Sequence, residues 1–171
     1  MSFETVTIGD ATLRETSFNS VHFSSEKDTW ATPQAFFDKQ NAIHNFTLDV
    51  CAQHDSAKCA TYYTAEDDAF TKPWGGIVWM NPPYGRGIGK WMQRAYEASL
   101  NGAKVVCLVP SRTDTAWWWD FALKGEIEFI KGRLKFGDAK SGAPFPSALV
   151  VFNPPLPAPP KQEQMSLEAS A

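Results

Sequence analysis

Five stretches of the chain have the hydrophobic pattern of β-strands. Four are mainly apolar, as strands buried on both faces are, and one alternates apolar and polar residues, as a strand with one polar face does. The apolar stretches are 46–52, 77–80, 104–109 and 147–152, and the alternating one is 126–136. The last two in the chain are expected to pair as an antiparallel hairpin at a sheet edge.

Segments of helical periodicity lie between these strands. Apolar residues recur at helical spacing from Ile88 to Ser99, and Asn101 with Gly102 predicts where that helix stops. Strands that alternate with helices indicate an α/β fold with a mostly parallel sheet.

Two further helices are predicted from their start signals. Thr32 suits an N-cap and Pro33 the first helical position of a helix that runs to about residue 43. Thr113 or Asp114 would cap a helix that carries residues 117–123. Its three adjacent tryptophans would spread over about 200° of arc, so at least one should face away from the core.

Length and composition favour one domain. The chain has 171 residues, of which 43% are hydrophobic, which is enough for a core. We expect an N-terminal arm at 1–27, a domain at 28–152 and a proline-rich flexible tail at 153–171. The net charge of −3 argues against a large phosphate-binding surface, although it is compatible with a local basic groove. No apolar stretch approaches the roughly twenty residues that span a bilayer.

The cysteines indicate a reducing compartment. Three cysteines and no signal peptide favour the cytoplasm. Cys51, His54 and Cys59 match no familiar zinc spacing and have no evident fourth ligand, so no metal is expected.

The tetrapeptide Asn-Pro-Pro-Tyr at 81–84 follows an apolar strand and precedes a helix. Ligands of open α/β sheets bind at the carboxyl ends of strands. Prolines fix φ and lack an N–H, so the Asn81 side-chain oxygen and the Pro82 carbonyl could face one site as acceptors, with the Tyr84 ring beside them. Such a site suits a planar target with an amino group, for example adenine. The similar tripeptide at 153–155 lacks the aromatic residue, and we interpret it as chance.

Six short motifs occur in order along the chain and together resemble the phage Dam-type DNA N-6-adenine methyltransferase family. The match covers roughly residues 30 to 152. The motifs are Thr-Pro-Gln at 32–34, Leu-Asp-Val-Cys-Ala at 48–52, Asn-Pro-Pro-Tyr-Gly at 81–85, Pro-Ser-Arg-Thr-Asp-Thr at 110–115, Arg-Leu-Lys-Phe-Gly at 133–137 and Ala-Pro-Phe-Pro-Ser-Ala at 143–148.

This resemblance implies a Rossmann-like methyltransferase fold, S-adenosylmethionine as cofactor, adenine N6 in DNA as target, and a phage or prophage origin in a bacterial host. The target base would be flipped out of the duplex. The resemblance implies that the catalytic residues are Asn81, Pro82, Pro83 and Tyr84. The residues expected near the cofactor are Thr32, Pro33, Asp49, Cys51, Ala52 and Asp68.

Basic residues and one aromatic residue are the candidates for DNA contacts. Phe136 would face the flipped base from the side opposite Tyr84, and the cations would bind phosphates. These cations are Arg112, Arg133, Lys135 and Lys140.

Two alternatives remain open at this point. The same pair of acceptors would serve a methyltransferase that acts on RNA or on a protein glutamine. A binding module that keeps the fold without catalysis is the other alternative, and the complete Asn-Pro-Pro-Tyr tetrapeptide argues against it.

Overall fold

The computed structural model describes residues 30–137 and 139–157. The predicted arm at 1–27 and residues 158–171 of the predicted tail therefore lie outside the described residues. The strands are β1 (Leu48–Asp49), β2 (Ile77–Met80), β3 (Lys104–Pro110), β4 (Glu126–Phe129) and β5 (Ser147–Phe152). The helices are α1 (Gln34–His44), α2 (Ile88–Leu100), α3 (Ala116–Asp120) and the short 3₁₀ turn η2 (Ala122–Lys124).

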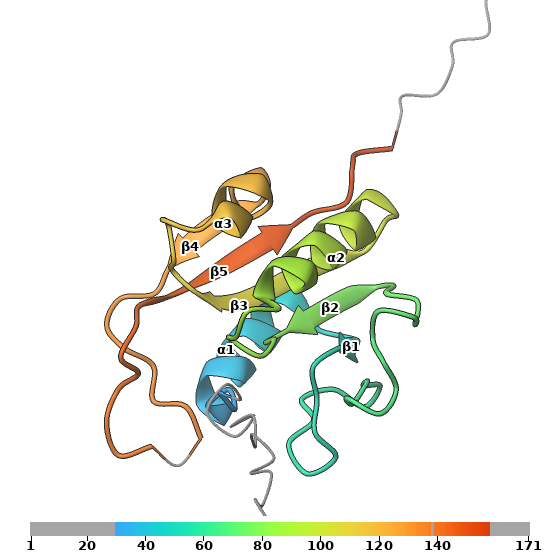
Figure 1. Cartoon of the computed structure of the whole chain (residues 1–171). Helices are drawn as coiled ribbons and strands as arrows, with labels where there is room; N and C mark the ends of the chain where they lie inside the picture. Colours follow the sequence, from blue (N-terminus) through green and yellow to red (C-terminus); the bar gives the residue numbers. More distant parts are fainter. Residues whose placement is uncertain (1–29, 138, 158–171) are drawn as a thin grey trace, which may run out of the picture.

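The five strands form one sheet in the order β1-β2-β3-β5-β4 (Figure 1). β1, β2 and β3 pair in parallel, whereas β5 is antiparallel both to β3 and to β4. Four strands thus run in one direction and β5 runs against them. The predicted α/β class with a mostly parallel sheet is confirmed at this level.

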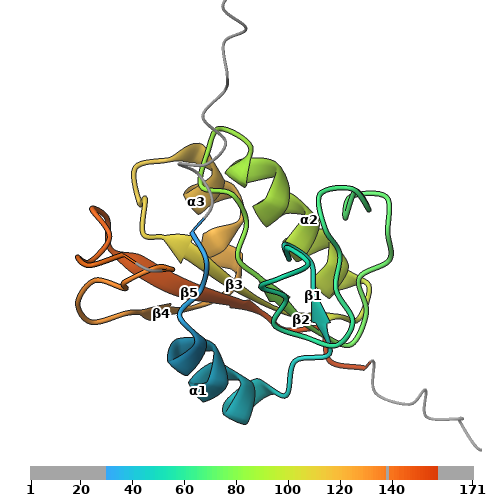
Figure 2. The ribbon, with the colours of Figure 1, turned by 90° about the horizontal axis from the view of Figure 1, so that it is seen from below.

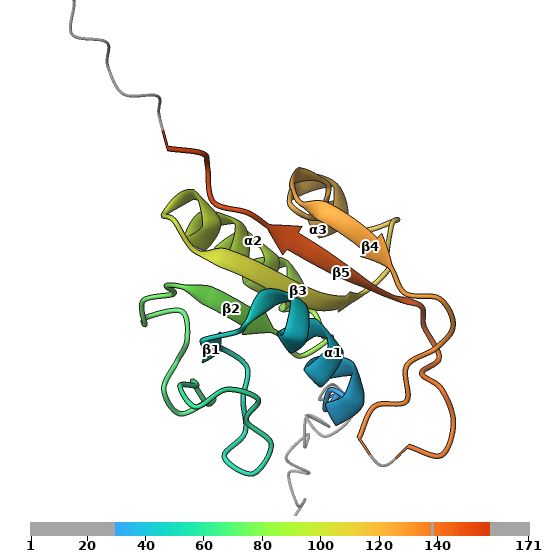
Figure 3. The ribbon, with the colours of Figure 1, turned by 180° about the vertical axis from the view of Figure 1, so that it is seen from behind.

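Helices cover both faces of the sheet. α1 lies on one face, and α2 and α3 lie on the other, as Figures 2 and 3 show from below and from behind. The middle of the sheet is the core because β3 is apolar along almost its whole length, and the side chains of Val105 to Val109 are completely buried. On the α1 side, the ring of Phe37 packs edge-on against Trp79 with ring centres 5.4 Å apart.

Two predicted strands are shorter than their apolar patterns suggest. The strand predicted at 46–52 is regular over Leu48–Asp49, after which the chain turns to form the loop that precedes β2. The strand predicted at 126–136 ends at Phe129, and the chain then turns at Gly132, which has a φ of +85°. Alternation beyond Phe129 was misleading because Leu134 and Phe136 pack from a loop and not from a strand.

The predicted helix after residue 114 also differs from expectation. Thr115 precedes α3 and makes no side-chain cap, and the helix stops at Asp120 before η2 continues the turn. Of the three tryptophans, Trp117 and Trp118 are buried, and Trp119 is 65% exposed. The expectation that one tryptophan faces away from the core is therefore confirmed. Within the described part of the chain, no helix has the length and apolarity needed to cross a membrane.

Candidate active site

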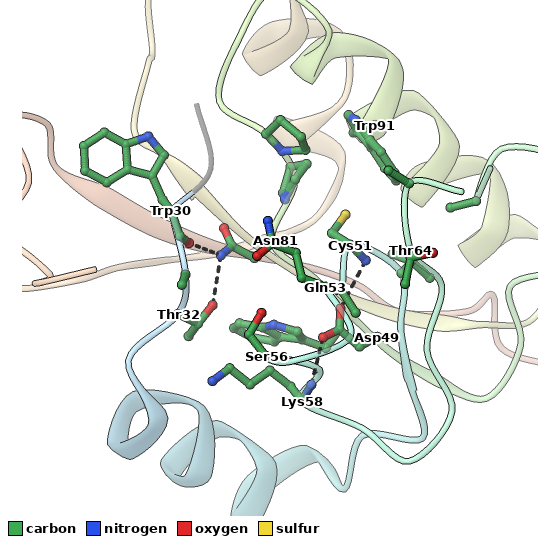
Figure 4. A pocket seen from close by; sticks show the side chains of 18 of the residues that line it. Trp30, Thr32, Asp49, Cys51, Gln53, Ser56, Lys58, Thr64, Asn81 and Trp91 are labelled. Carbon is green, nitrogen blue, oxygen red and sulfur yellow. Dashed lines mark hydrogen bonds between the residues drawn. The ribbon is translucent and has the colours of Figure 1, made fainter. Parts of the chain in front are cut away.

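A cavity of about 350 Å³ opens at the carboxyl ends of β1 and β2, and we call it the main cavity. Its size falls in the usual range of small-molecule sites, roughly 300–1,000 Å³. Several predicted site residues meet in its wall, which Figure 4 shows from close by. They are Thr32, Asp49, Cys51, Ala52, Asp68, Asn81, Pro82 and Pro83.

The side chain of Asn81 is held in one orientation by hydrogen bonds at both ends of its amide. Its Nδ2 donates to the backbone carbonyl of Trp30 and to Thr32 Oγ1, the latter at 2.9 Å (Figure 4). Its Oδ1 accepts the hydroxyl of Tyr84 at 2.7 Å. An amide oxygen has two lone pairs, so Oδ1 keeps one acceptor position for a further donor.

Thr32 does not cap α1 as its position in the sequence suggested. Pro33 is the N-cap residue, and its carbonyl accepts the N–H groups of Phe36 and Phe37 without help from a side chain. The threonine hydroxyl instead accepts from Asn81. The helix start therefore places Thr32 in the site. Pro33 itself is outside the lining of the main cavity.

Tyr84 is a buried residue, 7% exposed, and lies outside the lining of the main cavity. Its ring lies nearly parallel to that of Trp30, with ring centres 6.4 Å apart, and meets Phe136 and Phe145 edge-on. Its hydroxyl also lies 3.2 Å from the carbonyl oxygen of Leu108. Burial raises the pKa of the Tyr84 hydroxyl well above its ordinary value, so this group is a donor and not a base.

Asp49 ends β1 and is 4% exposed. Its two carboxylate oxygens accept the backbone N–H groups of Cys51 at 3.1 Å and Lys58 at 3.0 Å, and both bonds appear in Figure 4. Burial raises the pKa of this carboxyl, although the two hydrogen bonds act in the opposite direction. Asp49 therefore shapes the loop at 51–58 and brings a carboxylate to the floor of the cavity.

The rest of the cavity wall combines aromatic and acidic groups. Phe70 and Trp91 pack with ring centres 4.4 Å apart, and Asp68 lies nearby in the sequence with a φ of +49°. Both rings and Asp68 line the cavity. The wall thus offers flat apolar surface, two carboxylates and an oriented amide.

Several lining residues were not singled out as site residues from the sequence, among them Trp30, Lys58, Phe70 and Trp91. Trp30 reaches Asn81 across 51 positions, so no local pattern could reveal the contact. Trp91 looked like one more core residue of its helix, and the structure shows it between the core and the cavity.

The candidate DNA contacts do not lie in the main cavity. Arg133, Lys135 and Lys140 are exposed in the loop that joins β4 to β5. Phe136 is 4% exposed and its ring packs edge-on against Tyr84 and Trp30, so in this arrangement it presents no free face to a base. Arg112 lines a second cavity, which Tyr84 also lines.

In the described part of the chain, the cysteines belong to no cluster that could hold a metal ion. His54 contacts Tyr62 and Glu66, and burial raises the pKa of the Cys59 thiol to about 11. Burial also raises the pKa of the Cys51 thiol well above its ordinary value. Within residues 30–137 and 139–157, no three His, Cys, Asp or Glu side chains are placed to hold a metal ion.

Comparison with known proteins shows which family the chain resembles. The model of the family "DNA N-6-adenine-methyltransferase (Dam)" matches residues 19–165. A DNA N-6-adenine-methyltransferase of Haemophilus phage HP1 (strain HP1c1) is 30% identical over 144 residues, which cover 78% of this chain and 83% of the relative. A DNA N-6-adenine-methyltransferase of Escherichia phage T1 is 27% identical over 95 residues, 54% of this chain and 40% of the relative.

The family model and the HP1 relative each cover most of the chain, and the range of the family model includes the tetrapeptide at 81–84. They confirm the resemblance inferred from the six motifs and the predicted class of enzyme. The chain belongs to the Dam family of adenine-specific DNA N-6-methyltransferases.

Proposed function

We propose that the protein transfers a methyl group from S-adenosylmethionine, held in the main cavity, to the exocyclic N6 amine of an adenine flipped out of DNA. The observation that carries this proposal is the Asn81 amide on the cavity wall, held at both ends and left with one free acceptor position. The five-stranded sheet with α1 on one face and α2 on the other is compatible with the Rossmann-like arrangement that such enzymes have.

The chemistry of the lining suits S-adenosylmethionine. Phe70 and Trp91 offer flat surface for the adenine ring of the cofactor, and Asp68 an acceptor for its ribose hydroxyls. The buried carboxylate of Asp49 would bind the ammonium group, because an unpaired charge at that depth favours a cationic ligand. When bound, the cofactor supplies an electrophilic methyl group on a sulfonium.

Asn81 and Pro82 would bind and orient the target amine. Each accepts one N6 hydrogen, Asn81 through Oδ1 and Pro82 through its backbone carbonyl, and this raises the electron density on nitrogen as positive charge develops there. Tyr84 fixes Oδ1 through its hydroxyl and stays protonated, so it does not take up the proton. The methylated amine is itself acidic enough to lose its proton without a dedicated base.

In the bound state, Tyr84 and Phe136 would flank the flipped base. The present packing of Tyr84 against Trp30, Phe136 and Phe145 closes that space. Admission of a base would therefore require these rings to separate, and the partly buried Trp30 is the candidate for movement.

Substitution of Asn81 by Ala tests the assignment. We expect turnover to fall by at least about 10²–10³-fold, the loss seen when one stabilising contact of a transition state is removed. The dissociation constant for S-adenosylmethionine, measured by calorimetry, should change little. Asn153→Ala is the matched control, because Asn153 also precedes two prolines but bonds Glu126 Oε1 away from the site.

The substrate is tested with labelled methyl transfer to DNA, RNA and protein, followed by mass analysis for N6-methyladenine. DNA as the preferred acceptor supports the proposal, and the phage origin of both relatives supports a role in the cytoplasm of a bacterial host. Preferential labelling of RNA or of protein glutamine would contradict it. Wild-type turnover in Asn81→Ala would show that the catalytic assignment is wrong.

A further inference from the structure

A second cavity of about 500 Å³ lies beside the catalytic tetrapeptide and shares no lining residue with the main cavity. We call it the arginine groove. It lies where β3 ends and α2 begins, and the residues that matter for the argument are Tyr84, Arg86, Arg112, Thr115 and Trp117.

The catalytic segment forms part of the wall of both cavities. Asn81, Pro82 and Pro83 line the main cavity, whereas Tyr84, Gly85 and Arg86 line the arginine groove. The linings of the two cavities are in contact at this segment, because the hydroxyl of Tyr84 in the groove lies 2.7 Å from Oδ1 of Asn81 in the main cavity. A ligand in the groove is therefore one side chain away from the acceptor that would bind the target amine.

The groove carries two positive charges that have no ion-pair partner among the described residues. Arg86 and Arg112 are both exposed. The ion pair found in the described part of the chain joins His54 to Glu66, and no described hydrogen bond uses either guanidinium group. Asp114 is close to Arg112 in sequence but makes no ion pair with it within the described residues. The groove therefore has unpaired donors that suit an anionic ligand, and guanidinium groups match the geometry of phosphates.

Three hydrogen bonds involve the backbone groups of Arg112. Its N–H donates to the Pro110 carbonyl at 2.8 Å, and its own carbonyl accepts from the Thr115 backbone N–H and from Thr115 Oγ1. Arg86 directly precedes Gly87, the N-cap residue of α2. Both arginines are thus anchored at the ends of regular elements and not on the long loop at 130–146, where the other candidate cations lie.

We propose that the arginine groove binds the DNA strand that carries the target adenine, with Arg86 and Arg112 on phosphates that flank the flipped nucleotide. The strand would then deliver its base past Tyr84, while the methyl donor occupies the main cavity, which Asn81, Pro82 and Pro83 line. This inference rests on the proposed function, since it takes DNA as the substrate. It adds Arg86 to the candidate DNA contacts and gives the target base a path of entry.

The test compares Arg86→Gln, Arg112→Gln and the double variant with the wild-type full-length protein. DNA binding is measured by fluorescence anisotropy on a labelled duplex between 50 and 200 mM salt, and turnover by methyl transfer. Each lost phosphate contact should reduce the slope of log K against log salt by about 0.9. The double variant should thus lose about 1.8 in slope and bind DNA roughly tenfold more weakly, with unchanged affinity for S-adenosylmethionine.

Two sets of variants control for net charge and for folding. Lys39→Gln with Lys72→Gln removes the same total charge from exposed residues outside the groove, and it should leave the slope unchanged. Arg86→Lys with Arg112→Lys keeps both charges and should retain most of the slope.

The outcomes separate the two levels of the proposal. If the wild-type protein fails to methylate DNA, the proposed function is wrong. If the wild-type protein methylates DNA but the double Gln variant binds with the wild-type slope and affinity, the groove does not hold the strand. An equal loss of slope in the lysine control pair would also overturn the groove proposal, because the effect would then be one of net charge.

Discussion

Asn81 illustrates how the chemistry of one residue depends on its neighbours. In isolation its side-chain amide is free to rotate, and here hydrogen bonds with Trp30, Thr32 and Tyr84 set its orientation. An amide turned by 180° would present a donor where the target amine needs an acceptor. Thr32 is therefore expected to be a positioning residue.

Substitution of Thr32 by Val tests this role. It removes the acceptor for Asn81 Nδ2 while keeping the volume, and one hydrogen bond is worth about 0.5–1.5 kcal/mol. We expect kcat to fall by about three- to tenfold with little change in KM for S-adenosylmethionine. Thr32→Ser should restore kcat because it keeps the hydroxyl. A rise in KM for the cofactor with unchanged kcat would instead place Thr32 in contact with the cofactor.

The buried Asp49 predicts a dependence on pH. Burial raises its pKa in the folded protein. Its contribution to stability is therefore fully present below the pKa of the unfolded chain and is lost as the pH rises through the folded pKa. At neutral pH the ionised group is destabilising, and a cationic ligand would offset this cost.

We therefore expect the affinity for S-adenosylmethionine to weaken as the pH falls through the raised pKa of Asp49. The decline should begin above about 3.9, the ordinary value for an aspartate. Calorimetry between pH 4.5 and 8 measures it. Asp49→Asn should bind more weakly and show no such decline, and an unchanged pH profile in this variant would argue against contact with the ammonium group.

At the scale of the elements, the site depends on where the parallel strands end. The carboxyl ends of β1 and β2 form the main cavity, and that of β3 leads into the arginine groove. β2 begins directly after Gly76, which has a φ of +69°. A Cβ there would lie 2.6 Å from Thr47 Oγ1, and this hydroxyl is already hydrogen-bonded to both backbone groups of Ile77.

Gly76→Ala is expected to destabilise the fold by about 1–3 kcal/mol, because the substitution adds both a strained φ and a steric clash. Chemical denaturation monitored by tryptophan fluorescence measures the change. Gly75→Ala is the matched control, since a Cβ at Gly75 meets nothing within 4 Å, and its effect should stay within about 0.5 kcal/mol. Equal effects of the two substitutions would refute this explanation.

For the whole molecule, a net charge of −3 coexists with local cations at the proposed DNA site. General attraction to DNA is therefore weak, and binding depends on a few placed charges. If Arg86 and Arg112 alone bind phosphates, the slope of log K against log salt should be about −1.8. If Arg133, Lys135 and Lys140 bind as well, it should approach −4.5.

Substitution of the three loop cations by Gln distinguishes these cases. Binding of a labelled duplex is measured over a range of salt concentrations. A slope that stays near −1.8 in both the wild-type protein and this variant would assign phosphate binding to the groove alone. A slope much steeper than −4.5 in the wild-type protein would mean that cations outside both regions take part.

Local patterns in the sequence by themselves determined the positions of several strands and helices and the family of this protein. Apolar runs and stop signals gave the positions of β2, β3, β5 and α2 to within one or two residues, because each is an uninterrupted pattern with a clear end. The tetrapeptide at 81–84 and five further motifs gave the family, and they include Asp49, Asn81 and several other residues that line the main cavity. Interactions between residues close in sequence suffice for these features, since a strand end followed by Asn-Pro-Pro leaves the backbone few alternative conformations.

Contacts between distant residues decided the rest. The prediction that Thr32 caps α1 was wrong, because its hydroxyl accepts a hydrogen bond from Asn81, 49 positions away. The stacking surface expected of Tyr84 is covered by Trp30, Phe136 and Phe145, which come from both ends of the described chain. Arg86 and Arg112 share a groove because β3 ends close to the start of α2. Hydrogen bonding and burial at these sites depend on which segments meet in space. Periodicity along the chain does not predict these contacts between distant segments.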